Sequence, residues 1–273
     1  MDLVLRNLTT GYKTKRGQSI VTPSITATLQ AGELTCLLGP NGAGKSTLLR
    51  TLAAFQPPLG GQILLDGKAL QDYSSQDLAT RIGIVLTERP DIRGMRVREM
   101  VAMGRSPYTG FWGRLTTEDE DVVDEAINQV GIRALEQRMV HTLSDGERQK
   151  VMVAKALAQQ TPIIFLDEPT AFLDFPSKVE TMLLLSRLAH EMQKTIFIST
   201  HDLDLALQTA DRLWLLNKTQ LHESVNRESV NFVIGTPRQL ADDGTLARFF
   251  AAPGITFDAE GLMFRVSPGG TPL

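Results

Sequence analysis

Short apolar runs and longer segments of mixed polarity alternate along the second half of the chain. The apolar runs are residues 163–166, 195–198 and 212–216, and the mixed segments 176–192 and 202–210 lie between them. Runs of this length are typical of buried strands, and the mixed segments have the length of helices. Strands that alternate with helices indicate a parallel sheet with helical crossovers. The pattern therefore predicts an α/β fold.

The first part of the chain follows a different pattern. Residues 1–35 and 60–75 alternate between apolar and polar positions and are rich in turn residues. This alternation predicts an antiparallel β layer beside the parallel sheet. The more continuously apolar runs at 33–38 and 81–86 predict two further short strands.

The region from residue 95 to 160 has the pattern of a helical unit, with a loop rich in Gly, Pro and aromatic residues at 104–115. The segment Thr117-x-x-Glu120 fits a capping box, which predicts a helix that starts there and runs to about Gln129. After residue 217 the chain carries a short strand, a Thr236-Pro237 helix start and an end rich in Gly and Pro.

The most informative motif lies between the predicted strand 33–38 and a predicted helix that runs from Ser46 to Ala54. It fits the phosphate-loop pattern G-x-x-x-x-G-K-[ST] and consists of Gly39, Pro40, Asn41, Gly42, Ala43, Gly44, Lys45, Ser46 and Thr47. Its glycines let the backbone approach an anion closely. Lys45 is placed to reach the β- and γ-phosphates, and the Ser46 hydroxyl to bind Mg²⁺. The sequence therefore predicts a site for a nucleoside triphosphate.

Two carboxylates, Asp167 and Glu168, end the apolar run 163–166. Beside a phosphate loop, Asp167 would hold Mg²⁺ through water, and Glu168 would be the base that deprotonates the attacking water. His201 follows another apolar run and could face the γ-phosphate, although a lone histidine there is more often a structural hydrogen-bonding group. Tyr12, at a turn, could stack on an adenine ring.

A further segment, Leu143–Gln149, leads into a predicted helix at 147–159. Ser144-x-x-Glu147 is a capping box, which explains the segment structurally. The uncovered main-chain N–H of Gly146 at a helix start is equally suited to bind an anion, and both interpretations can hold together.

Composition and charge exclude several classes of protein. The chain has 273 residues, a net charge of −3 and a single cysteine, Cys36. No general basic field draws it to nucleic acid or anionic lipid, and a disulfide within the chain is impossible, which fits a reducing compartment. The first residues lack the features of a signal peptide. No apolar segment approaches 18 residues, so we expect no transmembrane span.

Taken in order, these motifs resemble those of the ATP-binding cassette (ABC) family along nearly the whole chain. The matching parts are the Walker A loop at 39–47, the signature at 143–149, Walker B at 163–168, the D-loop at Leu173-Asp174, the switch histidine His201 and the adenine-stacking Tyr12. The resemblance implies a phosphate-loop NTPase with a RecA-like core and parallel sheet, an antiparallel β subdomain and a helical subdomain. We expect the ATPase domain at 1–240, with the helical subdomain inserted at about 88–160. Residues 241–273 would form a C-terminal tail packed on the core.

The resemblance also implies an ATPase that uses ATP and Mg²⁺ in a head-to-tail dimer. Each ATP would touch the Walker A loop of one copy and Ser144 and Gly146 of the other, with Asp174 also at the nucleotide. Lys45, Glu168 and His201 would be the catalytic residues.

A narrower resemblance covers Met103–Tyr108, Gly113–Asp119 and Val122–Gly131, which are similar to ATPases of iron–siderophore, haem and vitamin B12 importers. The implied partners are integral-membrane permease subunits, contacted from about Thr87 to Trp112, and indirectly a periplasmic or surface binding protein. The implied place is the cytoplasmic face of the cell membrane. Tyr108, Phe111 and Trp112 could anchor the permease, or equally pack within the helical subdomain.

Two positions depart from the family pattern. Thr87 stands where the family has a glutamine that helps to position Mg²⁺, and a shift by one residue would put Glu88 there instead. Asp145 replaces the first of two glycines in the signature. We expect hydrolysis to survive, with Thr87 as a weaker metal-site residue and Asp145 pointing away from the nucleotide.

Three alternatives remain. The chain could serve a different transporter, or be a soluble ABC ATPase of DNA repair or ribosomes. The soluble ATPase is disfavoured because the chain has one cassette, no heptad run and no basic patch. A non-catalytic regulator is suggested by Thr87 alone, and Glu168 argues against it.

Overall fold

The computed structural model describes residues 2–15, 17–87, 93–110, 113–218 and 232–266. Its strands are β1 (Leu3–Thr14), β2 (Gly17–Leu29), β3 (Leu34–Leu38), β4 (Gly60–Leu65), β5 (Lys68–Ala69), β6 (Ile82–Val85), β7 (Ile163–Asp167), β8 (Thr195–Ser199), β9 (Arg212–Leu216), β10 (Phe232–Gly235), β11 (Ile255–Asp258) and β12 (Met263–Val266). Its α-helices are α1 (Lys45–Leu52), α2 (Ser75–Ala79), α3 (Val97–Ala102), α4 (Thr117–Val130), α5 (Asp145–Ala158), α6 (Phe175–Glu191), α7 (Leu203–Thr209), α8 (Pro237–Asp242) and α9 (Thr245–Phe249).

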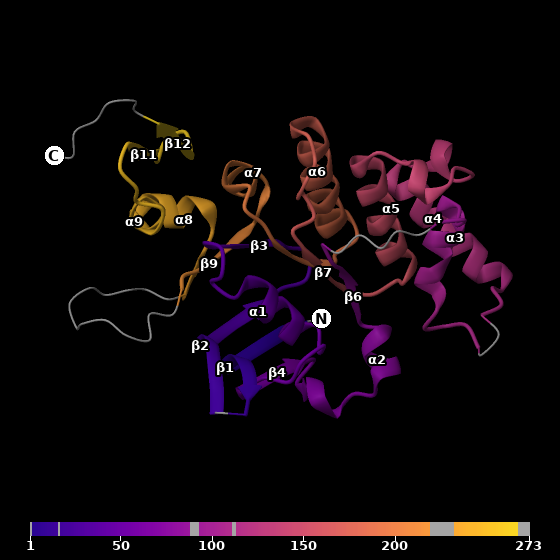
Figure 1. Ribbon diagram of the computed structural model, residues 1–273, viewed down its shortest axis with the longest axis horizontal. Helices are drawn as coiled ribbons and strands as arrows, with labels where there is room; N and C mark the ends of the chain where they lie inside the picture. Colours follow the sequence, from indigo (N-terminus) through magenta and orange to yellow (C-terminus); the bar gives the residue numbers. More distant parts are fainter. Residues whose placement is uncertain (1, 16, 88–92, 111–112, 219–231, 267–273) are drawn as a thin grey trace.

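A six-stranded sheet in the order β10-β9-β3-β8-β7-β6 forms the centre of the molecule. β3 runs parallel to β8 and β9, and β7 runs parallel to β6 and β8, whereas β10 pairs antiparallel with β9. Helices α6 and α7 cover one face of this sheet, and α1 lies on the other, next to β1, β2 and β4 (Figure 1). The predicted parallel sheet with helical crossovers is therefore confirmed.

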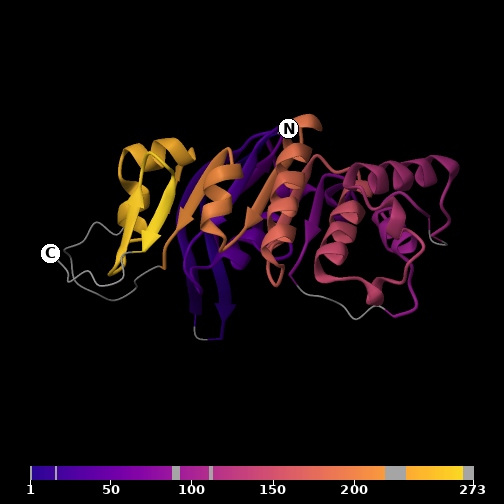
Figure 2. The ribbon, with the colours of Figure 1, turned by 90° about the horizontal axis from the view of Figure 1, so that it is seen from above.

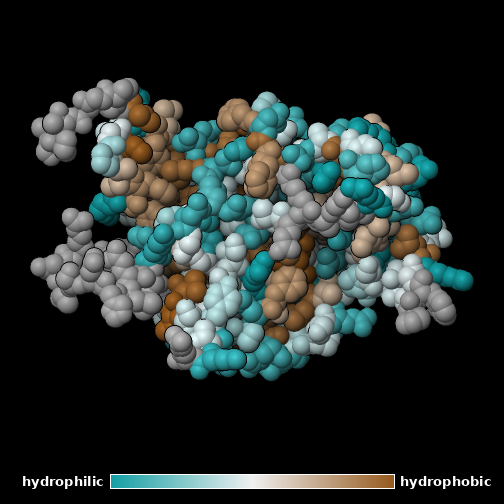
Figure 3. Space-filling view, in the orientation of Figure 1, coloured by the Kyte–Doolittle hydropathy of each residue, from teal (hydrophilic) through white to brown (hydrophobic). Residues whose placement is uncertain are grey.

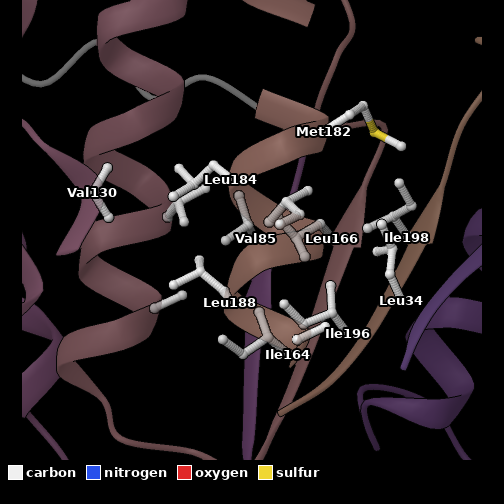
Figure 4. Close-up of a cluster of buried hydrophobic side chains, with 14 of the residues drawn as sticks. Leu34, Val85, Val130, Ile164, Leu166, Met182, Leu184, Leu188, Ile196 and Ile198 are labelled. Carbon is white, nitrogen blue, oxygen red and sulfur yellow. The ribbon is translucent and has the colours of Figure 1, made fainter. Parts of the chain in front are cut away.

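Alternate residues of the central strands pack into two different hydrophobic clusters, because successive side chains of a strand point to opposite faces. Ile164 and Leu166 of β7 belong to the cluster that includes Leu184 and Leu188 of α6 (Figure 4). Phe165, between them, belongs to the cluster that includes α1 and β1. The β7 strand is buried on both faces, so its C-terminal end is held rigidly where Asp167 and Glu168 follow.

A second sheet, in the order β2-β1-β4-β5, confirms the predicted antiparallel layer. β1 pairs with both β2 and β4, and its Leu3, Leu5 and Leu8 are buried. Figure 2 shows these strands beside the central sheet. The layer supplies Tyr12 near one end of β1.

The helical region α3–α5 stands to one side of the central sheet (Figure 1). The capping box predicted for α4 is wrong by one residue. The N-cap is Thr116, whose Oγ1 accepts a hydrogen bond from the Asp119 N–H at 3.2 Å, while Asp119 Oδ2 accepts one from the Thr116 N–H at 2.9 Å. Asp119 is favoured at this position because its other carboxylate oxygen accepts a hydrogen bond from Nε of Arg105 at 2.8 Å.

Arg105 joins the 104–115 loop to the helical region through a buried ion pair with Asp119. Both side chains are almost inaccessible, at 5% and 7% exposure. The Arg105 guanidinium also donates to the Ala158 carbonyl at 2.9 Å. The main-chain N–H of Thr116 and then the Arg105 guanidinium lower the pKa of Asp119 from 3.8 to about 2. The stability that the ionised Asp119 contributes is therefore present above about pH 4 and is lost as the pH falls toward 2.

We expect Arg105→Met to lower the free energy of unfolding by about 3 kcal/mol, because it leaves the buried Asp119 carboxylate without its charged partner. Urea unfolding at pH 7 measures this loss. Arg133→Met is the matched control, because Arg133 is 47% exposed in its ion pairs with Asp124 and Glu136. The control should lose less than about 1 kcal/mol. Equal losses in the two variants would contradict the structural role of Arg105.

The C-terminal elements contain a hairpin that the sequence analysis did not predict. β11 and β12 pair antiparallel. The ring of Phe264 in β12 packs edge-on against the ring of Phe250, with 5.6 Å between the two ring centroids. Leu246 of α9 is fully buried in the large cluster. Met263 and Val266 of β12 are exposed. Figure 3 shows apolar surface over this C-terminal part of the molecule. The domain boundary at residue 240 stays a prediction.

Candidate functional site

The phosphate-loop residues connect the end of β3 to the start of α1, as the motif predicts. The loop is packed so closely that a side chain at Gly39 or at Gly44 would collide with neighbouring residues. A Cβ atom on Gly39 would lie 2.0 Å from the Leu216 carbonyl oxygen. Gly44 has φ +101°, and a Cβ atom there would lie 2.3 Å from Val21 Cγ1. These contacts fix the course of the loop directly before the N-terminus of α1, where main-chain N–H groups favour an anion.

Lys45 is the buried cation of this loop. Its side chain donates hydrogen bonds to the carbonyl oxygens of Gly39 at 2.8 Å and Pro40 at 3.2 Å. Burial lowers the pKa of Lys45, and the negative charges of Glu168 and Asp167 oppose that shift. The ammonium group therefore has nearby main-chain acceptors that a phosphate can replace.

Asp167, at the end of β7, meets the phosphate loop from the neighbouring part of the sheet. Its Oδ1 accepts hydrogen bonds from Ser46 Oγ at 3.2 Å and from Ser199 Oγ at 2.5 Å. The carboxylate and the Ser46 hydroxyl are oxygen ligands of the kind that Mg²⁺ prefers, and Mg²⁺ usually needs only one or two carboxylates beside substrate phosphates and water. The described residues include no group of three or more His, Cys, Asp or Glu side chains arranged for a metal ion. The pair formed by Ser46 and Asp167 nevertheless fits Mg²⁺ held together with a nucleotide.

Glu168 and His201 lie against each other, with Glu168 Oε1 2.6 Å from His201 Nε2. Glu168 has φ +49°, in the left-handed region that glutamate rarely adopts. Its main-chain N–H donates to the carbonyl oxygen and the hydroxyl of Ser199, at 3.1 and 3.0 Å. Such strain is concentrated at functional sites. The structure thus brings together the predicted base and the predicted switch histidine.

Ser199 was missed by the sequence analysis. It binds both the Asp167 carboxylate and the Glu168 main chain, and its side chain is fully buried. Its place at the end of an apolar run, two residues before His201, was the available signal. Serine at such a position is common in ordinary strands, so the signal is weak.

Thr87 lies just beyond β6, at the same edge of the sheet. Its hydroxyl donates to the main-chain carbonyl of Asp167 at 2.7 Å, which leaves its oxygen free to accept or to bind a cation. The hydroxyl therefore positions Asp167 directly, whereas its role as a metal ligand stays a prediction. Glu88 lies outside the described residues.

We expect Thr87→Ala to lower the rate of ATP hydrolysis about fivefold, because a hydrogen bond of this kind contributes about 1 kcal/mol. A steady-state phosphate-release assay measures the change. Thr80→Ala is the control, because Thr80 directly follows α2, away from the site, and makes a similar hydrogen bond to the Asp77 carbonyl at 2.9 Å. Equal activity in both variants would remove Thr87 from the site.

Tyr12 lies next to the phosphate loop. Its hydroxyl is 2.9 Å from the Thr47 hydroxyl, and about half of its side chain is exposed. This contact places an accessible aromatic ring at the edge of the loop. Stacking on a base stays a prediction.

The signature segment caps α5 as expected. The Ser144 hydroxyl accepts from the Glu147 N–H at 3.2 Å, and Glu147 Oε2 accepts from the Ser144 N–H at 2.8 Å. Asp145 is exposed at the first position of α5. Figure 1 shows α5 to one side of the sheet, away from α1, so this segment and the phosphate loop occupy separate parts of the molecule.

Gly146 and Asp174 are linked through the start of α6. Asp174 caps α6 by accepting a hydrogen bond from the Ser177 N–H at 3.1 Å. A Cβ atom on Gly146 would lie 2.7 Å from Ser177 Oγ, so the signature segment packs tightly on the same turn. The D-loop and the signature are thus neighbours within one chain.

Of the three predicted permease anchors, the structure describes Tyr108 alone. Tyr108 is 42% exposed, but its hydroxyl donates to the Gln159 carbonyl at 2.9 Å and its ring lies 4.0 Å from the Arg105 guanidinium. These contacts pack part of Tyr108 against the helical region, and its contact with a permease stays a prediction. Phe111 and Trp112 lie outside the described residues.

Comparison with known proteins identifies the family. The family described as ABC transporter matches residues 23–171. The petrobactin import ATP-binding protein FpuC of Bacillus anthracis is 40% identical over 71% of this chain and 71% of its own length. The ferric enterobactin transport ATP-binding protein FepC of Escherichia coli is 37% identical over 86% of this chain and 88% of its own length.

A solved dimeric structure of a bacterial ABC transporter cassette has a similar fold. It superposes with a TM-score of 0.68 and 27% identity, and covers 79% of this chain and 94% of its own. In the described parts of the chain, we find no helix that combines the length and apolarity needed to traverse a bilayer.

Proposed function

The chain belongs to the ABC transporter family as an ATPase that couples ATP hydrolysis to transport, and we propose that it powers the import of an iron chelate. The observation that carries the catalytic part is the convergence of Lys45, Asp167 and the Glu168–His201 pair at one edge of the sheet. The importer is supported by relatives named for petrobactin import and ferric enterobactin transport. An iron–siderophore is the favoured cargo, with haem and cobalamin as alternatives.

The contacts of the site residues support a role in hydrolysis for each of them. Lys45 exchanges its carbonyl acceptors for phosphate oxygens and clamps the β- and γ-phosphates. Glu168 accepts the proton of the attacking water, and His201, now beside Glu168, donates to the γ-phosphate when ATP is bound. Ser46 and Asp167 would hold Mg²⁺, which would supply positive charge against the negative charge that develops on the phosphates.

A second copy of the chain completes the nucleotide site in this proposal. Ser144 and Gly146 of one copy would contact the γ-phosphate bound in the other copy, and Asp174 would lie at the same junction. The separation of α5 from α1 within one chain supports this arrangement, as does the dimeric form of the similar cassette. Tyr12 would stack on the adenine.

The proposed complex sits at the cytoplasmic face of a bacterial cell membrane. Permease subunits would contact the segment from about Thr87 to Trp112, and a periplasmic or surface binding protein would deliver the chelate to them. Nucleic acid is not an expected partner, because the net charge is −3.

Affinity purification of this chain from detergent-solubilised membranes of its host tests the proposal. We expect mass spectrometry to find a many-helix membrane protein in near-equal amount. The binding protein of that system is then tested with ferric siderophores, haem and corrinoids. Recovery of ribosomal or DNA-repair proteins alone would contradict the importer, and binding of corrinoids alone would contradict the iron cargo.

A further inference from the structure

We propose that Lys178 is a positioning residue for hydrolysis, which acts through Asp202 on the loop that carries His201. The proposal rests on the functions proposed above for Glu168 and His201. Lys178 lies in the first turns of α6, and its ammonium group is 2.7 Å from Asp202 Oδ1. Asp202 directly follows His201 in the chain. Lys178 itself has no proposed contact with ATP.

Asp202 is held by two partners from different segments. Its Oδ1 pairs with Lys178, and its Oδ2 accepts a hydrogen bond from the hydroxyl of Thr170, which is 1% exposed. Thr170 stands two residues after Glu168, in the turn that the Glu168 carbonyl closes through the Ala171 N–H at 3.0 Å. Asp202 therefore connects the segment that follows the predicted base to the segment that carries the predicted switch histidine.

The ion pair between Lys178 and Asp202 can determine the position of the loop that carries His201, because this loop has open space on one side. A hollow of about 410 Å³ borders it, and Lys178, His201 and Asp202 are among the residues that line it. Close packing on that side therefore does not fix His201. The side chains of Lys178 and Asp202 are only 27% and 23% exposed, so solvent screens their attraction less than that of a surface pair.

The position of Lys178 also ties this loop to the segments that a second copy would contact. The Lys178 N–H donates to the Asp174 carbonyl at 3.0 Å, in the turn that Asp174 caps. The neighbouring Ser177 packs against Gly146 of the signature segment. A shift of the D-loop or signature on dimer formation would move the start of α6, and Lys178 would pass that shift to Asp202 and His201.

The first test is the steady-state kinetics of Lys178→Met. We expect kcat to fall about tenfold, within the range that a small misplacement of a catalytic group can cost, while KM for ATP changes less than about twofold. Lys178→Arg keeps the charge and should restore most of the activity.

Lys150→Met is the matched control. Lys150 also pairs with a carboxylate, Glu180 Oε2 at 2.6 Å, and that pair likewise involves α6 but does not reach the His201 loop. Its kinetics should equal those of the unmodified protein. Loss of activity in both variants, or none in Lys178→Met, would overturn the proposal. Absence of hydrolysis in the unmodified protein would instead contradict the proposed function.

The second test is NMR of the histidine side chains without nucleotide, which does not depend on activity. The chain has four histidines, and the His201 signals are assigned by their loss in His201→Ala. Lys178→Met should shift these signals and leave the other imidazoles unchanged, and Lys178→Arg should restore them. Unchanged His201 signals in folded Lys178→Met would show that Lys178 does not position this residue.

Discussion

Replacing Glu168 with glutamine lowers the rate of ATP hydrolysis at least about a hundredfold, the contribution expected from a positioned general base. The amide has the size of the carboxylate but cannot accept the proton of the attacking water. ATP should still bind, because the phosphate contact proposed for Lys45 and the Mg²⁺ contact proposed for Ser46 are untouched. Phosphate release measures turnover, and equilibrium binding of a fluorescent ATP analogue measures affinity.

The same variant provides a test of the dimer. When hydrolysis is blocked, we expect light scattering to find two copies associated in the presence of ATP and Mg²⁺. Glu180→Gln is the control, because Glu180 is exposed on α6 and pairs only with Lys150 among the ion pairs of the described residues. Full turnover in Glu168→Gln would contradict the assignment of the base, and a monomer with ATP bound would contradict the shared site.

Replacing Lys45 with alanine weakens ATP binding by roughly 30- to 100-fold. A hydrogen bond from a charged group contributes about 2 to 3 kcal/mol, and each 1.4 kcal/mol is about tenfold in affinity. Lys45 is 6% exposed, and the charges of Asp167 and Glu168 act on its ammonium group, so these three residues belong to one site. Isothermal titration with ATP and Mg²⁺ measures the loss.

Lys194→Ala is a close control for this prediction. Lys194 is 8% exposed, burial lowers its pKa as it lowers that of Lys45, and its ammonium donates to the Thr161 carbonyl at 2.7 Å. It precedes β8, whereas Lys45 follows the parallel strand β3, so the two lysines lie at opposite edges of the sheet. ATP affinity should be unchanged in Lys194→Ala. Equal weakening in both variants would indicate that buried lysines stabilise the fold and not the nucleotide.

Motifs that depend on neighbouring residues were predictable from the sequence. The phosphate loop needs its glycines and Lys45 within nine positions, and its flanking strand and helix are where the hydrophobic pattern puts them. The capping box of Ser144 and Glu147 is equally local. The box predicted at Thr117 was wrong because Thr116-x-x-Asp119 competes with it. The buried partner of Asp119, Arg105, decides between them.

Contacts between distant segments could not be predicted in this way. Ser199 binds Asp167 across 32 positions, and Lys178 pairs with Asp202 across 24. Serine, lysine and aspartate are common at strand and helix ends, so only the packing of the sheet and α6 reveals these partners. The β11–β12 hairpin was missed because two four-residue strands carry too little periodicity.

The most direct test of the central claim is uptake of a radiolabelled ferric siderophore by host cells in which this chain carries Glu168→Gln. The host's own siderophore is the probe, and immunoblotting confirms equal amounts of the two proteins. We expect uptake to fall to the level of cells without the chain, while uptake of an unrelated amino acid stays unchanged. Undiminished uptake of the ferric siderophore would contradict the account.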